Sequence, residues 1–259
     1  LIQSGQKIQM SYTIKNTDRT VGARLSSYVV TDFKNNNFPE NHIKIKLRGS
    51  AGQSLGAFGA KGVKFEVIGD CNDYVGKGLS GATISVRPPK SSNLETNKNT
   101  IIGNTVLYGA TSGNLFAAGQ AGERFSVRNS GATAVVEGAG TNACEYMTGG
   151  YAVILGELGD NFAAGMTGGM AFVYNPEDNL SDVINSASVV WQRIETKYWD
   201  DFLYSLIQKH IEETHSDYAK KILDDWELAK EQFYQICPKE MLDKLDNPIS
   251  LREPEKKAV

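Results

Sequence analysis

Short stretches of alternating hydrophobic and polar residues recur along the first two thirds of the chain, each preceded by a glycine. The markers lie 19, 32, 18, 19 and 19 residues apart, at Gly62, Gly81, Gly113, Gly131, Gly150 and Gly169. Positions one, three and five after a marker are mostly hydrophobic, as in Val63, Phe65 and Val67. Alternation with period two is typical of β-strands, and a repeat of about 19 residues is typical of stacked turns of chain.

The repeat predicts one inner core in which Phe65, Ile84 and Phe172 lie above one another. The alternate positions are polar in the early repeats and hydrophobic in the late ones: Lys64, Glu66, Thr83 and Ser85 against Ala152, Ile154, Ala171 and Val173. We therefore expect the outer face of the early turns to contact water and that of the late turns to be covered. Glycine adopts positive φ easily, so the glycines are expected at the corners between strands.

Three regions follow from these patterns. Residues 1–42 form a lead-in, with a strand that places Ile8, Met10, Tyr12 and Ile14 on one face and a helix over 21–33 that Thr20 caps. Residues 43–175 form about six to seven stacked coils, interrupted by a loop at PPKSSNLETNKNT (88–100). Residues 176–259 form an α-helical extension.

The last region has a different composition, with no glycine, all three tryptophans and 29 of the 57 charged residues. Hydrophobic residues at four-residue steps from Val190 to Leu206 predict a long amphipathic helix. A second helix is predicted from Ser216, as N-cap, through Phe233, and Pro238 ends it and starts a short third one.

These two main helices need a surface on which to bury their hydrophobic faces. The hydrophobic outer positions of the late coils offer one. We expect the helical hairpin to pack there, with Trp199 and Trp226 out of contact with water.

Composition narrows the class of protein. Hydrophobic residues make up 41% and charged residues 22%, and the net charge of −3 does not favour binding to nucleic acid. The absence of a run of 18 hydrophobic residues predicts no membrane span, and the start lacks both a signal peptide and an initiator Met. We therefore expect a cytoplasmic fragment or processed piece. The cysteines Cys71, Cys144 and Cys237 are far apart, which favours buried free thiols.

Candidate motifs for chemistry are weak. The segment Gly76-Lys-Gly78-Leu-Ser-Gly81 matches GxGxxG, but a dinucleotide site needs a helix to follow and ATISVRPP is a strand pattern. His210 and His215 are five residues apart, do not share a helical face, and are expected at a solvated helix end, while His42 lies alone beside a turn. We therefore predict no catalytic, cofactor-binding or metal-binding residue in this chain.

Polar residues recur near the expected corners, at Asn72, Asp73, Asn129, Glu137, Glu145, Asp160 and Asn161. They form either ladders that satisfy corner backbone groups or, as in a carbohydrate-active β-helix enzyme, a groove that binds calcium or sugar. Arg124 and Arg128, which follow Glu123, make either internal ion pairs or contacts with a partner domain.

Long stretches of the chain resemble a known family: KNTDRTVGARLSS (15–27), residues 49–89 and 101–140, and CEYMTGGYAVILGELGDNFAAGMTGGMAFVYN (144–175). They resemble the C-terminal GXGXG domain of the glutamate synthase large (alpha) subunit. The tail, with LIQKHIEETHSDYAKKILDDWE, resembles the helical end of that subunit. One of the subunits of formylmethanofuran dehydrogenase and stand-alone GXGXG proteins are similar as well, so an assembly subunit of another redox complex is the alternative.

The resemblance implies a right-handed parallel β-helix that acts as a scaffold. It implies a parent enzyme that makes two glutamates from glutamine and 2-oxoglutarate with electrons from NAD(P)H or ferredoxin. In that family the amidotransferase domain, and the synthase domain with FMN and a 3Fe–4S cluster, are separate from this one. The expected partners are therefore those domains or subunits, and the chain alone is expected to be non-catalytic, with no cofactor of its own.

Overall fold

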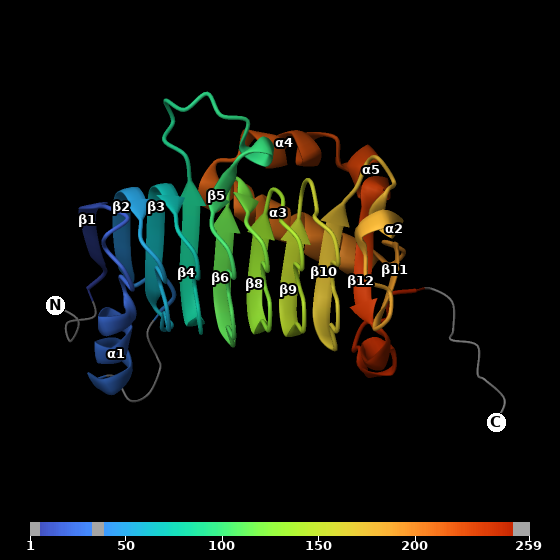
Figure 1. Cartoon of the computed structure of the whole chain (residues 1–259), viewed down its shortest axis with the longest axis horizontal. Coiled ribbons are helices and arrows are strands. Elements are labelled where there is room, and N and C mark those ends of the chain that lie inside the picture. The colour runs from blue at the N-terminus through green and yellow to red at the C-terminus, as the bar shows by residue number, and fades with distance from the viewer. Residues whose placement is uncertain (1–5, 33–38, 251–259) are drawn as a thin grey trace.

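The computed structural model describes residues 6–32 and 39–250. Within them, twelve strands form one open sheet with the order β1-β2-β3-β4-β6-β8-β9-β10-β12-β11, and β5 and β7 lie off this path (Figure 1). The strands are β1 (Ile8–Ile14), β2 (Ile43–Ala51), β3 (Val63–Cys71), β4 (Ser80–Arg87), β5 (Thr100–Ile102), β6 (Ser112–Ala117), β7 (Gln120–Ala121), β8 (Ser130–Val136), β9 (Thr148–Ile154), β10 (Gly168–Tyr174), β11 (Val189–Arg193) and β12 (Phe233–Pro238). Every pair from β1 to β10 is parallel, which confirms the prediction of a mainly β fold with successive parallel strands.

The lead-in region joins this sheet directly. Strand β1 covers the predicted residues and pairs in parallel with β2 over its whole length. Helix α1 (Ala23–Asp32) begins two residues later than Val21, because Thr20 and Gly22 both have positive φ and turn the chain first. Phe33, the last residue of the predicted helix, lies outside the described residues.

Counted from the marker glycines, the residues whose side chains point into the core are not at the same positions in every strand. Phe65 pairs with Ile84, and the same inner row continues through Leu115, Ala134, Ala152 and Ala171. The prediction that Phe172 belongs to this row is therefore wrong. Phe172 pairs with Val153 and lies on the outer face, and Ala152, Ile154, Ala171 and Val173, predicted to be outside, point inward.

One-residue irregularities near the strand starts cause this difference. Ser80 pairs with Ser112, but Thr83 pairs with Asn114, so β4 has one residue more than β6 in this stretch. The same irregularity recurs between β8 and β9. Because side chains alternate with period two, each one-residue shift moves a hydrophobic set to the opposite face. The marker glycines are thus out of register with one another, and columns counted from them mix the two faces.

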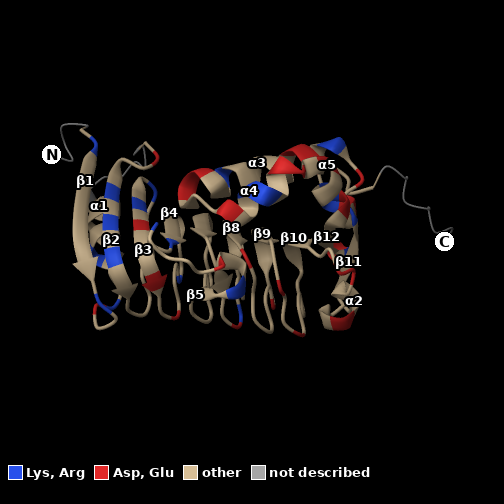
Figure 2. Ribbon diagram, turned by 90° about the horizontal axis from the view of Figure 1, so that it is seen from above, with Lys and Arg blue, Asp and Glu red and all other residues tan. Residues whose placement is uncertain are grey.

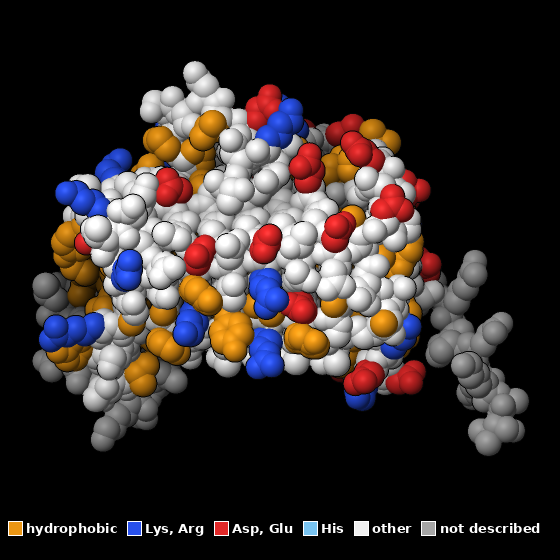
Figure 3. Space-filling model, in the orientation of Figure 1, with side chains coloured by type: hydrophobic (Ala, Val, Ile, Leu, Met, Phe, Trp, Pro, Cys, Tyr) orange, Lys and Arg blue, Asp and Glu red, His pale blue; other side chains and the backbone are white. Residues whose placement is uncertain are grey.

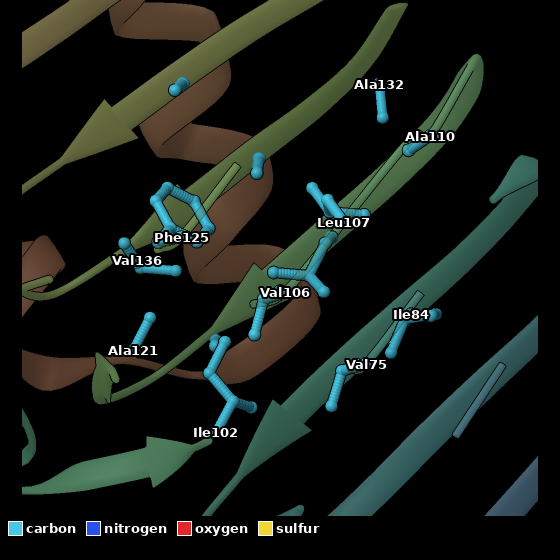
Figure 4. Packing of buried hydrophobic residues seen from close by; sticks show 14 of the residues in the cluster. Val75, Ile84, Ile102, Val106, Leu107, Ala110, Ala121, Phe125, Ala132 and Val136 are labelled. Carbon is cyan, nitrogen blue, oxygen red and sulfur yellow. The ribbon is translucent and has the colours of Figure 1, made fainter. Parts of the chain in front are cut away.

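Opposite the strands, the chain returns through six stacked five-residue segments whose first, third and fifth residues have φ between 52° and 66°. These segments, which we call the left-handed wall, are 54–58, 74–78, 105–109, 124–128, 142–146 and 161–165. Backbone hydrogen bonds join successive rows: Ser54 N–H donates to Asp73 O (2.9 Å), and Gly76 N–H donates back to Leu55 O (2.9 Å). The wall and the sheet enclose the inner core, which includes Val75, Ile84 and Phe125 (Figure 4).

Glycine supplies less of the positive φ than the sequence suggested. Five of the marker glycines have φ between 81° and 112°, as expected of corners, whereas Gly131 does not. In the wall, however, six rows of three give eighteen left-handed positions, of which only five are glycine: Gly56, Gly76, Gly78, Gly109 and Gly165. Each of the other thirteen costs about 1–2 kcal/mol in backbone strain, which the inter-row hydrogen bonds and the core must offset.

The C-terminal region contains both helices and strands. The helical elements are α2 (Leu180–Val183), α3 (Lys197–Thr214), α4 (Asp217–Asp224), α5 (Trp226–Ala229) and the 3₁₀ turns η3 (Lys230–Gln232) and η4 (Lys239–Lys244); η2 (Thr96–Lys98) lies in the 88–100 loop. Ser216 caps α4 as predicted, since its Oγ accepts from Ala219 N–H. The helix predicted from Val190 begins only at Lys197, because Val189–Arg193 pair with β12. Phe233 starts β12 rather than continuing a helix.

The helices pack on the late strands, but not through Ala152, Ile154, Ala171 and Val173, the outer positions predicted for this contact, because those residues lie in the inner core. Helices α3 and α4 lie along the outer face of the sheet (Figure 2), where Phe116, Val135, Val153 and Phe172 pack with Leu203 and Ile207 in a second core. Trp199 is buried as predicted, whereas Trp226 is only half-buried, so the prediction that it has no contact with water is wrong. The early outer face is less exposed than predicted, because Glu66, Thr83 and Ser85 are buried under neighbouring side chains and the end of α3.

Candidate functional site

A buried polar cluster fastens the helices to the sheet. Glu137 follows β8, His210 lies on α3 and Ser216 precedes α4, and the side chains of Glu137 and His210 are fully buried. His210 Nε2 lies 3.2 Å from Glu137 Oε1, and Ser216 Oγ donates to the same carboxylate oxygen. Glu137 Oε2 and His210 Nδ1 have no hydrogen-bond partner among the described residues.

This cluster combines a serine, a histidine and a carboxylate, yet its geometry is that of an anchor. Ser216 Oγ also accepts from Ala219 N–H, so its hydroxyl caps helix α4, and the side chains of Glu137 and His210 have no exposed surface. The prediction of a solvated helix end is therefore wrong for His210 and right for His215, which is exposed in a left-handed C-cap conformation. The buried position of His210 follows from its four-residue offset to Thr214 and three-residue offset to Ile207, both buried.

The predicted corner residues form ladders. Asp73 Oδ1 accepts Asn104 N–H and Asn104 Oδ1 accepts Glu123 N–H, both at 2.8 Å. On the next coils, Asn161 donates to Asn142 Oδ1 at 2.7 Å and Asn185 donates to Asn161 Oδ1 at 2.9 Å. Asn104 and Asn142 could also have been predicted from the sequence, since Asn104 lies one repeat after Asp73 and Asn142 lies one repeat before Asn161.

The remaining predicted polar residues are structural too. Asn72 Oδ1 accepts Asp73 N–H, and the buried Asn129 bonds the backbone of Gly131 and Ala132. The backbone oxygen of Asp160 accepts Asn142 N–H. Among the described residues, no group of three or more His, Cys, Asp or Glu is placed to hold a metal ion.

The thiols and the glycine motif have the structural roles predicted for them. Cys71, Cys144 and Cys237 are free and buried, and burial raises the pKa of all three, to about 11 for Cys237. Gly76 and Gly78 lie in the left-handed wall, and a strand follows Gly81. His42 is buried beside the start of β2. No dinucleotide fingerprint is present in this segment.

A charged cluster covers the outer face of β2–β4. Glu66 lies between Lys44 Nζ at 2.7 Å, Lys46 Nζ at 3.4 Å and Arg87 Nη2 at 3.5 Å. Burial alone would raise the pKa of Glu66, but the hydrogen bonds and charges of the two lysines lower it to about 2. Lys64 reaches the end of α3 through an ion pair with Glu213 at 2.5 Å.

A cleft of about 770 Å³ opens between the 88–98 loop and the junction of α3 with α4. Arg87, Lys98 and Lys221 line it together with Glu95 and Asp217, so charges of both signs face the space. On one side Tyr218 donates to Leu155 O at 2.7 Å, and burial is the main cause that raises the pKa of Tyr218 to about 12. The mixed charge selects no single class of ligand.

The wall has an exposed face that sequence reasoning found only in part. Arg124 and Arg128 project from two left-handed positions of one row, and Arg124 Nη1 lies 3.9 Å from Glu145 Oε2. The neighbouring rows add exposed aromatic side chains: Phe58, Tyr74, Tyr108 and Tyr146. We call these six side chains the aromatic–arginine stripe; Figure 3 shows hydrophobic and basic side chains gathered in a band along this face.

Comparison with known proteins places the chain in a family. Residues 1–239 match the model of the GXGXG motif family. The chain is 61% identical to the glutamate synthase [NADPH] large chain of Azospirillum brasilense over 97% of its own length and 17% of that protein. It is 49% identical to the ferredoxin-dependent glutamate synthase of Pyropia yezoensis and 47% to glutamate synthase [NADH] of Schizosaccharomyces pombe, over 90% and 94% of the chain.

The matched region is a small part of each of these relatives, 15% of the algal protein and 12% of the yeast one. Among the described residues, no helix is long and hydrophobic enough to cross a membrane. The match extends through the repeats, the left-handed wall and most of the helical region. The chain therefore belongs to the GXGXG motif family, and its relatives are glutamate synthases.

Proposed function

We propose that the chain is the scaffold domain of a cytoplasmic glutamate synthase that makes two glutamates from glutamine, 2-oxoglutarate and a reductant. In this proposal residues 43–175 wind as a right-handed parallel β-helix between the lead-in of residues 1–42 and the helical extension of residues 176–259. The identity of 61% over nearly the whole chain is the observation that carries the proposal.

The proposed role is mechanical. Ladders of backbone and side-chain hydrogen bonds along successive rows, with two continuous cores on either side of one sheet, make a stiff body. Such a body holds two distant sites in fixed relation, as transfer of ammonia between an amidotransferase and an FMN- and 3Fe–4S-containing synthase domain requires. The partners are those other domains, and the chain contributes no catalytic or cofactor-binding residue of its own.

The alternatives have less support. A carbohydrate-active enzyme needs carboxylates that converge on a groove, whereas Glu137 is buried under the helices and Asp73 accepts a backbone N–H at a corner. An assembly subunit of a different redox complex would share the stacked strands. The names of the relatives favour glutamate synthase over it.

A domain exchange tests the proposal. The 259-residue chain replaces the matched region of the Azospirillum large chain, and glutamine-dependent glutamate formation is measured with the purified hybrid enzyme. We expect activity within a few-fold of the parent enzyme, and no flavin absorbance or iron in the 259-residue chain alone. A folded but inactive hybrid, or a flavin spectrum in the chain alone, would contradict the scaffold role.

A further inference from the structure

The aromatic–arginine stripe is held in place against the preference of its own backbone. Phe58, Arg128 and Tyr146 occupy the fifth, left-handed position of their rows, with φ of 52° to 56°. Glycine occupies the same column in the other three rows, at Gly78, Gly109 and Gly165. The fold therefore accepts glycine in this column and would be less strained with it throughout.

Internal packing does not explain why large side chains stand there. The ring of Phe58 lies against Gly78 and that of Tyr146 against Gly165, because a Cβ added to either glycine would come within 2.7 Å of the ring. Even so, Phe58 remains 58% exposed and Tyr146 53% exposed. Arg128 is exposed as well. Strain that secures exposed side chains points to a contact outside the described chain.

The composition of the stripe is that of a protein interface. Tyrosine and arginine are enriched at the centres of such interfaces, where they supply most of the binding energy. Lys77 lies 5.8 Å from the ring centroid of Tyr74 and adds a third cation, while Glu145 lies beside Arg124 and the exposed Glu123 precedes that arginine in the chain. A complementary surface would present hydrophobic side chains flanked by Asp and Glu.

We infer that the aromatic–arginine stripe is the surface on which the rest of the glutamate synthase large chain docks, through a hydrophobic patch with an acidic margin. This inference rests on the proposed function, because the relatives devote more than four fifths of their length to regions outside the match. The helix-covered face of the sheet is already filled by α3 and α4, whereas the stripe is open to solvent.

Oxidative footprinting of the hybrid enzyme and of the 259-residue chain alone tests the inference. Phe58, Tyr108 and Tyr146 should react at least fivefold more slowly in the hybrid than in the isolated chain. Tyr198 and Tyr204, exposed on α3, serve as internal controls with unchanged rates. An active hybrid in which the three stripe residues react as fast as in the isolated chain would overturn the inference and leave the proposed function standing.

Glycine substitutions separate docking from folding. In the 259-residue chain, Phe58→Gly with Tyr146→Gly should leave the urea midpoint unchanged or raise it. In the hybrid, the same pair should increase the rate at which a protease releases the domain by at least tenfold. Thr105→Gly, at a left-handed position outside the stripe, is the matched control and should not change that rate. Equal release rates for the unmodified hybrid, its Phe58→Gly/Tyr146→Gly variant and its Thr105→Gly variant would contradict docking at the stripe.

Discussion

The outer face of one sheet is built in two different ways along its length. Over β2–β4 it carries Lys44, Lys46 and Arg87 around a central Glu66. Over β6–β10 it is hydrophobic and lies under α3 and α4, where Phe172 packs 6.0 Å from Trp199, ring centre to ring centre. The inner face is hydrophobic at both ends of the sheet.

The difference shows that stacking depends on the inner face, while the outer face is free to serve other purposes. Where helices are available the outer face becomes a second core. Beyond the end of the helices, the carboxylate of Glu66 is paired with the side chains of Lys44, Lys46 and Arg87. Helix α3 ends at the boundary, since Glu213 in its last turn pairs with Lys64 on β3. The two halves should therefore respond very differently to the same kind of substitution.

Truncation on the covered face should have the largest effect. Phe172→Ala removes a fully buried ring from the contacts with Trp199 and Phe202, and we expect a loss of about 3–5 kcal/mol in the free energy of unfolding. Urea titration followed by tryptophan fluorescence measures it.

Lys46→Ala is the matched truncation on the charged face. It leaves the Lys44–Glu66 pair in place, so the expected loss is about 0–1 kcal/mol. Similar losses for the two variants would mean that the helices add little to the stability of the late strands.

The two halves also differed in how well the sequence predicted them. Strand β1 appears on the predicted residues and β2 begins at residue 43, where the first coil was predicted to start, because their alternation is uninterrupted and their register with each other is continuous. The later strands were located correctly from the glycines, but Phe116, Val153 and Phe172 were assigned to the wrong face. Because of the irregularities near the strand starts, the inner residue lies three positions after its marker glycine in β3, β4 and β8 but two positions after it in β6, β9 and β10, so one counting rule mixes the two faces.

Long-range pairing explains the other misses. Phe233 continues a four-residue hydrophobic pattern from Tyr218, so only its pairing with Tyr174 on β10 makes it a strand residue. His210 and Glu137 lie 73 residues apart, and no local pattern predicts that they meet. The aromatic residues of the stripe were missed for a related reason. Phe58 and Tyr146 share one column only because the chain returns through the left-handed wall, and positive φ at these two positions is not expected of aromatic residues.

Acid should destabilise the charged half selectively. The pKa of Glu66 is about 2 in the folded protein against 4.5 for a free side chain. A lowered folded pKa means that Glu66 contributes its full stabilisation above pH 4.5 and loses it as the pH falls from 4.5 towards 2. The contribution is at most about 3 kcal/mol. We expect Glu66→Gln to flatten the stability profile in this interval, as measured by urea titrations at successive pH values. An unchanged slope would show that the lysines do not hold the carboxylate ionised.

The contact that joins the two halves should also give a small effect. Lys64 and Glu213 are both mostly buried at the side chain, 14% and 13% exposed, and their ion pair links β3 to the last turn of α3. A double-mutant cycle with Lys64→Met and Glu213→Gln should give a coupling energy of about 0.5–1 kcal/mol, because the cost of desolvating both charges offsets much of their attraction. If α3 transmits the contact, Glu213→Gln should also speed amide exchange in the last turn of α3 without changing exchange in β9. Equal acceleration in both elements would show that α3 and the late strands open as one unit. The Lys64–Glu213 contact would then not act on the helix separately from the strands that it covers.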